Sequence, residues 1–507
     1  MKQLKVSAAL FLLVLVGAGM ACRLSSPTPA SWSATPSAQA RAETNAAIVM
    51  TQDAAVGEEN LSTPTREIAE EQETSTLTQI TADGPWLVYP APSGAVLHAY
   101  DVDTGGITEI SLPEPIYTED LTSGLSPDGH TLIVRAGSPS NTDELGLYRV
   151  DLPEGGIEKI SNLLSISLQR KIVNQEGTRA AETLQAVTRP DGLAWSPDGR
   201  YLAFTAALDN ESSDLYVYDT ESDRVDRLNG LYSQNTAPFW APNSNRLVSQ
   251  ELEFYGEEQG WRSVNVSSIR FPGYDDQNTV YVPISRSQGE VFLGWTNANR
   301  FVSYSMTADG PFRIRQVNVQ SLGMSIRFDG FFDSAAYDPG SGTLAFSLSS
   351  AHAAGQGLTA GIYMMQQESS IYRLVRAGEW DQLTWEAEGM FVAGGESGVF
   401  VFTHTGDGFF LPGENNANYS PHGNWMVAWG QGERSNLGAR LYQPSSDHAL
   451  QTLVEGPVEA VLWQPDSKGL FIQSEGAIHH LRFPGLKPRE VENGFPTGVN
   501  LAMAWVE

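Results

Sequence analysis

The sequence of 507 residues is poor in cysteine and in basic residues. It contains one cysteine, Cys22, which therefore has no disulfide partner within the chain. Basic residues are scarce, because 31 Lys and Arg stand against 60 Asp and Glu and give a net charge of −29. A chain this acidic repels phosphate backbones, so we expect no nucleic-acid partner. Its apolar run near the N-terminus has about 11 residues, too few to span a membrane.

Motifs with a known chemical mechanism are also missing. The sequence has no GxSxG nucleophile elbow, no glycine loop of the phosphate-binding kind and no HExxH. His479 and His480 are adjacent on an expected strand, so they point to opposite faces and cannot bind one metal together. We therefore predict no catalytic residue, no metal site and no cofactor. An enzyme remains the less favoured alternative.

The N-terminus has the features of an export signal. A short basic segment, MKQLK, precedes the apolar run VSAALFLLVLV, and small residues lead to Cys22 in GAGMAC. This stretch resembles a bacterial lipoprotein signal, although the family usually has Leu where this chain has Gly19. The resemblance implies cleavage after residue 21 and lipidation of Cys22. Ordinary secretion with a free thiol is the alternative. We expect a chain anchored to a membrane by lipid, with its folded part outside the cytoplasm.

The next segment, residues 22–80, is rich in Ser, Thr, Ala, Pro and Glu, as in SSPTPASWSATPSAQA. Such a composition buries too little apolar surface to offset the entropy of ordering. We expect a disordered linker with a root-mean-square span of about 40 Å.

A repeated hairpin pattern fills residues 81–507. Its copies are LTSGLSPDGHTLIV, GLAWSPDGRYLAF, APFWAPNSNRLVS, VFLGWTNANRFVSYS, SAAYDPGSGTLAF, QLTWEAEGMFVAG, NANYSPHGNWMVAW and AVLWQPDSKGLFIQ. Pro, Asp or Asn, and Gly at successive positions are typical of tight turns. An aromatic residue precedes the turn in seven copies: Trp195, Trp240, Trp295, Tyr337, Trp385, Tyr419 and Trp463.

Most copies are followed by a third and a fourth apolar segment, and four antiparallel strands per unit make a propeller blade. The segment after Pro85 supplies three strands without a first, whereas NLAMAWVE supplies a first strand alone. Pairing these ends beside Val88 and Trp505 would close the ring. We therefore predict an all-β propeller with nine units. Eight blades remain the alternative if one unit is irregular, and the unit from Phe239 to Ile284 is the least regular.

The repeats resemble the WD40-like (PD40 or TolB-type) β-propeller repeats of bacterial envelope proteins, over about residues 81–507. In such proteins the propeller usually serves as a binding platform, and some members add an α/β-hydrolase domain. The blades leave no room for such a domain here. The resemblance therefore implies a binding or scaffolding module for a protein, peptide or glycan in the cell envelope, and we expect a monomer. The alternative is a propeller enzyme of the lactonase, lyase or hydrolase type.

A second regularity lies four or five residues before each aromatic position, where the innermost strand begins. Every unit has a carboxylate or a carboxamide there: Asp120, Asp191, Asn235, Glu290, Asp333, Asp381, Asn415, Glu459 and Asn500. Such a ring at the channel mouth would attract basic ligands or a divalent cation. The alternative is that each side chain caps its strand or bonds a nearby loop.

Two insertions interrupt the blade rhythm and are candidates for shaping a binding face. The first is 162–190, where Arg170, Lys171, Arg179 and Arg189 stand out and a short helix is expected from Thr178. The second is EFYGEEQGWRS, with aromatic residues that either contact a ligand or pack on a neighbouring blade.

Overall fold

The computed structural model describes residues 84–506 except for 93–95, 139–140, 153–155, 176–177, 229–233, 255–260, 271–278, 282–288, 308, 322, 367–368, 387–388, 415, 431–437, 444–448 and 500. Of residues 141, 143 and 252–289, the structure describes the backbone of the strands alone. The expected signal peptide, Cys22 and the linker lie outside the described residues. Within the described part, no helix is both long and apolar enough to cross a membrane.

Within the described residues the strands form nine sheets, which we number as blades in chain order. Blade 1 contains β1 (Trp86–Pro90), β2 (Val96–Asp101), β3 (Ile107–Ser111) and β35 (Ala504–Val506). Blade 2 contains α2 (Asp120–Gly124), β4 (Thr131–Ser138), β5 (Asn141–Asp151) and β6 (Ile157–Asn162). Helices α3 (Ile166–Val173) and α4 (Thr178–Val187) follow. Blade 3 contains β7 (Leu193–Trp195), β8 (Tyr201–Ala206), β9 (Asp214–Asp219) and β10 (Arg224–Arg227).

The remaining blades follow the same order. Blade 4 contains β11 (Gln234–Trp240), β12 (Arg246–Phe254), β13 (Trp261–Arg270) and β14 (Thr279–Tyr281). Blade 5 contains β15 (Gly289–Asn297), β16 (Arg300–Thr307), β17 (Gly310–Asn318) and β18 (Met324–Phe331). Blade 6 contains β19 (Ser334–Asp338), β20 (Thr343–Leu348), α5 (Ser350–Gln356), β21 (Gly361–Met365) and β22 (Tyr372–Ala377). Blade 7 contains β23 (Gln382–Glu386), β24 (Met390–Gly395), β25 (Gly398–Thr403) and β26 (Gly408–Pro412). Blade 8 contains β27 (Asn416–Tyr419), β28 (Met426–Trp429), β29 (Ala439–Tyr442) and β30 (Gln451–Val454). Blade 9 contains β31 (Val458–Trp463), β32 (Gly469–Ser474), β33 (Ala477–Arg482) and β34 (Arg489–Asn493).

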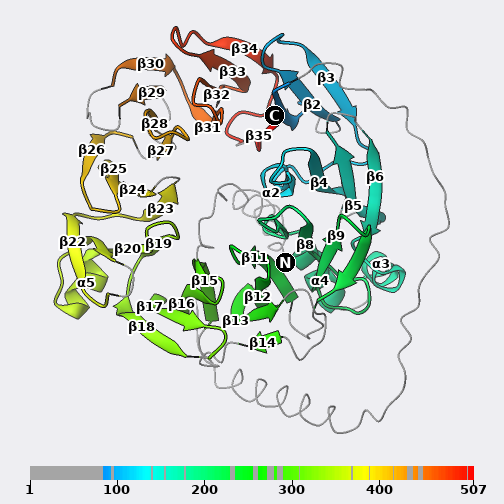
Figure 1. Ribbon diagram of the computed structural model, residues 1–507, viewed down its shortest axis with the longest axis horizontal. Coiled ribbons are helices and arrows are strands. Elements are labelled where there is room, and N and C mark those ends of the chain that lie inside the picture. Colours follow the sequence, from blue (N-terminus) through cyan, green and yellow to red (C-terminus); the bar gives the residue numbers. More distant parts are fainter. Residues whose placement is uncertain are drawn as a thin grey trace, which may run out of the picture.

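The blades follow one another around a ring, as Figure 1 shows, with the first strand of each blade innermost and the fourth on the rim. The ring closes where β35 pairs antiparallel with β1, so that Leu87 lies opposite Trp505 and Val88 opposite Ala504. This pairing confirms the predicted closure by two segments far apart in the sequence. The sheet count of nine decides between the two predicted blade numbers.

Blade 2 departs from the expected pattern, because the first strand predicted for the copy LTSGLSPDGHTLIV is replaced by helix α2. Isolated bridges, between Leu125 and Leu132 and between Ile116 and Ala136, form the pairing on this side of β4, so this sheet has three strands and each of the others has four. The unit expected to be least regular, blade 4, has a complete sheet instead.

The aromatic residues that mark the repeats join neighbouring blades. The indole Nε1 atoms of Trp195, Trp240 and Trp295 donate to the carbonyls of Gly124, Ala194 and Phe239 at 2.7, 3.0 and 3.0 Å. Trp463 donates in the same way to Asn418. Each acceptor is the residue just before the corresponding aromatic or leucine position of the preceding blade. This bond recurs at four of the eight aromatic positions. At the other four, Tyr337, Trp385, Tyr419 and Trp505, the polar side-chain atom is buried without a hydrogen-bond partner among the described residues.

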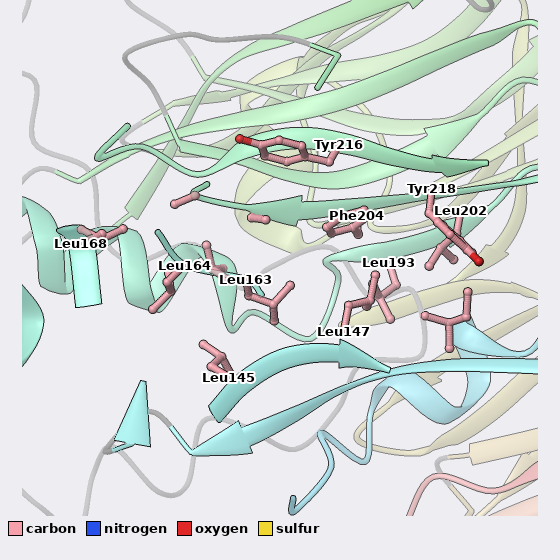
Figure 2. Close-up of a cluster of buried hydrophobic side chains, with 14 of the residues drawn as sticks. Leu145, Leu147, Leu163, Leu164, Leu168, Leu193, Leu202, Phe204, Tyr216 and Tyr218 are labelled. Atoms are coloured by element: carbon pink, nitrogen blue, oxygen red, sulfur yellow. The ribbon is translucent and has the colours of Figure 1, made fainter. Parts of the chain in front are cut away.

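Apolar side chains fill the spaces between adjacent blades. A large cluster lies between blades 2 and 3 and includes Leu145, Leu202 and Phe204. Figure 2 shows these side chains together with Leu168 of α3. Helices α3 and α4 are therefore anchored to the ring by their apolar sides, which include Leu168, Ala180 and Val187.

The two faces of the ring differ because strand direction fixes where each connection lies. The innermost strands all run from one face to the other. The first and second strands are joined on one face, where the third and fourth strands also join; we term this the turn face. The connections between the second and third strands lie on the opposite face, and so do the connections between successive blades. All four described helices lie in connections on this other face or at the start of an innermost segment there. We term it the helix-bearing face.

Candidate functional site

Seven of the nine predicted ring residues lie within the described part of the chain, and Asn415 and Asn500 lie outside it. The seven stand at or next to the start of the innermost segment of their blades, on the helix-bearing face. Their surroundings differ too much for them to act as one uniform acidic ring.

Asp120 is fully buried and paired with Arg135 of β4, which is also fully buried. The guanidinium donates from Nε to one carboxylate oxygen at 2.8 Å and from Nη2 to the other at 2.6 Å. The backbone N–H of Arg135 donates to the same carboxylate, and Nη1 donates to the carbonyl of Val187 at 2.6 Å. This charge-assisted network ties α2 to the second strand and to the end of α4. It leaves no open carboxylate for a ligand.

Asn235 and Glu290 are also fully buried. The Asn235 amide donates to the carbonyl of Ser213 at 3.4 Å and accepts from the hydroxyl of Ser249 at 3.1 Å. Glu290 accepts from the hydroxyls of Ser303 and Ser305, and Nε of Arg315 lies 3.7 Å from Oε1. Burial raises the pKa of Glu290 to about 7. Both side chains connect their innermost strand to neighbouring strands.

Glu459 has one oxygen that is paired and one that is not. The strand ladder shifts register between Val458 and Ala460, so Glu459 occupies a bulge near the start of β31. Oε1 accepts from the backbone N–H of Gly498 at 3.3 Å, whereas Oε2 is buried without a hydrogen-bond partner. Burial raises the pKa of this carboxyl.

The remaining three carboxylates are more open to solvent. Asp191 pairs with Arg189, with Nη2 and Oδ2 3.0 Å apart. Asp333 accepts from the backbone N–H of Ser349, and its Oδ1 lies 3.1 Å from Nδ1 of His352 on α5. Asp381 is exposed at the start of blade 7. Asp333 and Asp381 therefore lie at equivalent positions of adjacent blades, and Asp381 is the more open to solvent. Among the described residues, no group of three His, Cys, Asp or Glu side chains could hold a metal ion.

The first predicted insertion forms α3 and α4 on the helix-bearing face, and α4 begins at Thr178 as expected. Among its predicted basic residues, Lys171 pairs with Glu211 and Arg189 with Asp191. Arg170 is exposed, and so are Ile166 and Val173 on the same side of α3, with exposed fractions of 52% and 65%. The tip of the second insertion and all of its aromatic side chains lie outside the described residues.

Besides helices α2 and α3, which were not predicted, sequence reasoning missed two features of this face. Helix α5 was not expected, although SAHAAGQ is rich in Ala and ends before Gly357, which adopts φ 67° as a left-handed cap. The buried pair of Arg135 was also missed. Its signal was an arginine inside the apolar strand TLIVRAG, since a buried arginine requires an anionic partner.

Comparisons with known proteins give the fold and not the function. No protein-family model matches the sequence, and no curated protein matches it. A crystal structure of the eukaryotic initiation factor is similar, with a TM-score of 0.53 and 12% identity over 83% of this chain and 98% of that one. TolB from Acinetobacter baumannii matches 64% of this chain and 78% of its own, with 10% identity and a TM-score of 0.31.

A peptidase is also among the structural matches. Porphyromonas gingivalis dipeptidyl peptidase 4 is 14% identical, with a TM-score of 0.42 over 80% of this chain. The present chain spans 59% of the length of that enzyme. Of these three matches, the one with a TM-score above 0.5, to the initiation factor, bears on this chain, and at 12% identity it bears on the fold alone.

Proposed function

We propose that this protein is an exported, lipid-anchored β-propeller that binds a protein, peptide or glycan of the bacterial cell envelope through its helix-bearing face. The observation that carries the proposal is the gathering of all four described helices on that face, whereas short turns predominate on the other. The four helices depart from the blade repeat, and the ring does not need them in order to close. Long connections placed together on a rigid scaffold commonly serve recognition.

The exposed side of α3 supports the proposal. Ile166 and Val173 remain open to solvent although α3 buries Leu168 against the blades, and Arg170 lies between them on the helix surface. Exposed apolar side chains beside a cation suit a partner surface that is apolar and acidic. Asp333 and Asp381 offer a second contact point, for a basic group, on the same face.

Photo-crosslinking in the bacterial host tests the binding face. A photoreactive residue is placed at Ile166 in one variant and at Glu221, in the exposed turn between β9 and β10 on the turn face, in a matched control. We expect a discrete crosslinked product from position 166 and none from position 221. Products of equal yield from both positions, or from neither, would contradict the proposed face.

Membrane anchoring has a separate test. We expect Cys22→Ser to move the protein from the membrane fraction to the soluble exported fraction, with Ser26→Ala as the control. If the substituted protein stays with the membrane, Cys22 is not its anchor.

A further inference from the structure

A group of basic residues lies on the turn face of blade 9, opposite the helices. Lys468 is in the turn between β31 and β32, Arg482 ends β33, Lys487 is in the turn that follows, and Arg489 begins β34. The two turns lie side by side, because the backbone N–H of Phe483 donates to the carbonyl of Lys468 at 2.9 Å. We term these four side chains the basic corner.

The basic corner contrasts with the charge of the whole chain. Basic residues are outnumbered about two to one, 31 against 60, yet residues 468–489 contain four basic residues and one acidic residue. That acidic residue, Glu475, lies between β32 and β33 and so on the opposite face. The four cations are therefore concentrated at one place on the turn face.

Nearby carboxylates neutralise half of this charge. Lys468 Nζ lies 3.2 Å from Asp466, and Arg482 Nη1 lies 3.1 Å from Asp103 of blade 1. Both basic side chains remain accessible, with exposed fractions of 75% and 52%. Glu490 is bonded to the amide of Asn493 at 2.6 Å.

The other two basic residues, Lys487 and Arg489, are exposed and have no carboxylate partner among the described residues. The guanidinium of Arg489 lies against the turn of blade 1, where a methyl group on Gly105 would be 2.3 Å from Nη2. Burial, and then the charges of Arg482 and Arg489, lower the pKa of His480 to about 4, so both guanidinium groups lie near this imidazole. The corner thus presents charge that its own fold does not neutralise.

Two stacked aromatic rings border the basic corner. Trp425 of blade 8 packs on Phe483, with ring centroids 5.0 Å apart and planes 28° from parallel. Both rings are half-buried, so part of their surface faces solvent beside Arg482 and Lys468. The corner therefore combines an apolar ring surface with exposed cations.

We propose that the basic corner binds carboxylate-bearing sugar residues of an acidic polysaccharide. The C–H face of a sugar ring packs on an aromatic side chain, and its carboxylate accepts hydrogen bonds from Arg and Lys. An acidic peptide would satisfy the cations but makes no comparable use of Trp425 and Phe483. This site is on the turn face and does not depend on the partner proposed for the helix-bearing face.

Calorimetric titration of the purified protein with tetragalacturonate and with an alginate tetramer tests this assignment. The test variant is Lys487→Gln/Arg489→Gln, which changes exposed residues without carboxylate partners. Arg224→Gln on blade 3 is the matched control, since it removes an exposed arginine elsewhere. We expect the double substitution to weaken binding at least tenfold and the control to leave it unchanged. Absence of binding to both tetramers, or equal binding by both variants, overturns the proposal.

Two further measurements separate sugar recognition from charge attraction. Methyl-esterified tetragalacturonate keeps the sugar rings and loses the charges, and we expect it not to bind. Trp425→Leu keeps an apolar side chain against Phe483 and removes the indole. We expect it to weaken tetragalacturonate binding severalfold and to leave any binding of a glutamate tetramer unchanged. If the glutamate tetramer binds as tightly as the sugar acids, the partner is an acidic peptide and the proposal fails.

Discussion

Blades 2 and 3 contain the same turn sequence, SPDG, but differ in the segment before it. In both turns the serine hydroxyl donates to the aspartate two residues later, at 2.6 Å for Ser126 and 2.5 Å for Ser196. Yet the preceding segment is a strand with Trp195 in blade 3 and the helix α2 in blade 2. The turn is therefore determined locally, whereas the innermost segment is determined by what it meets inside the ring.

The difference has an identifiable cause in two residues of blade 2. Arg135 places a buried guanidinium on the second strand, which Asp120 at the start of α2 neutralises. Gly124 ends α2 so close to β4 that a methyl group there would lie 1.8 Å from the carbonyl oxygen of Ile133. The innermost segment of a blade pairs with a neighbour on one side only, so a helix can replace it. A helix in place of a central strand would break the pairing on both sides.

The largest expected effect comes from removing the innermost strand of blade 1, which, within the described part of the chain, has no helix to take its place as blade 2 has. Deleting residues 500–507 removes β35, and with it the buried side chains of Met503, Ala504 and Val506. We expect the free energy of unfolding to fall by on the order of 5 kcal/mol or more, from lost apolar burial and an unpaired β1 edge. Thermal unfolding followed by circular dichroism measures it. An unchanged melting temperature would mean that blade 1, like blade 2, needs no first strand.

The next effect compares equivalent carboxylates in blades 2 and 3. Asp120→Ala leaves Arg135 buried without its anion, and we expect a loss of about 3–5 kcal/mol. Asp191→Ala breaks a pair with Arg189 that is partly exposed, and we expect less than about 1 kcal/mol. Urea unfolding of both variants gives the two values. If both variants lose a similar amount of unfolding free energy, the buried pair of Asp120 and Arg135 does not explain the difference between blades 2 and 3.

A pH series extends the comparison to blade 5. The pKa of Glu290 is raised from 4.5 to about 7, so the folded chain holds this proton where the unfolded chain releases it. Stability from this group is therefore present at low pH and is lost as pH rises from about 4.5 through 7. In the parent chain the free energy of unfolding falls over that pH range because of this group. In Glu290→Gln we expect the fall to be smaller by on the order of 3 kcal/mol. Asp309→Asn, which changes an exposed carboxylate, should leave the pH slope as in the parent chain.

The smallest expected effect concerns the close approach of α2 to β4. Gly124→Ala must displace the helix end from the Ile133 carbonyl, and we expect a loss of about 1–3 kcal/mol. Ala194 is the equivalent residue of blade 3 and lies in a regular strand, so Ala194→Gly serves as the control. We expect about 1 kcal/mol there, from backbone entropy and the loss of one partly buried methyl group, without a steric clash. Differential scanning calorimetry resolves the two changes, and the reverse order would argue against the steric explanation.

Much of the fold could be predicted because its determinants are local and repeated. The turn residues and the aromatic position recur in nearly every unit, and they fixed the blade order and the closure by Trp505. Helix α2 could not be predicted from this pattern. It depends on the pairing of Asp120 with Arg135, 15 residues later, which no repeat encodes.

The candidate site was less predictable than the fold. The ring residues were located by their spacing, but spacing does not state what each side chain contacts. Asp120 meets an arginine, Asn235 meets serines and Asp381 meets solvent, although all three stand at equivalent positions. Their environments arise from side chains of other strands. The stacking of Trp425 on Phe483 likewise joins two blades, at a separation that no local pattern reveals.

The pairing of Leu87 with Trp505 sets a limit on the timing of folding during synthesis. Trp86 and its partner Val506 are 420 residues apart, so at synthesis rates of about 5–20 residues per second roughly 20–80 s separate the making of the two strands. Throughout that interval the nascent chain carries an unsatisfied edge on β1 that is open to wrong partners. A chain of this kind would gain from a chaperone that shields its first strands until the last one emerges.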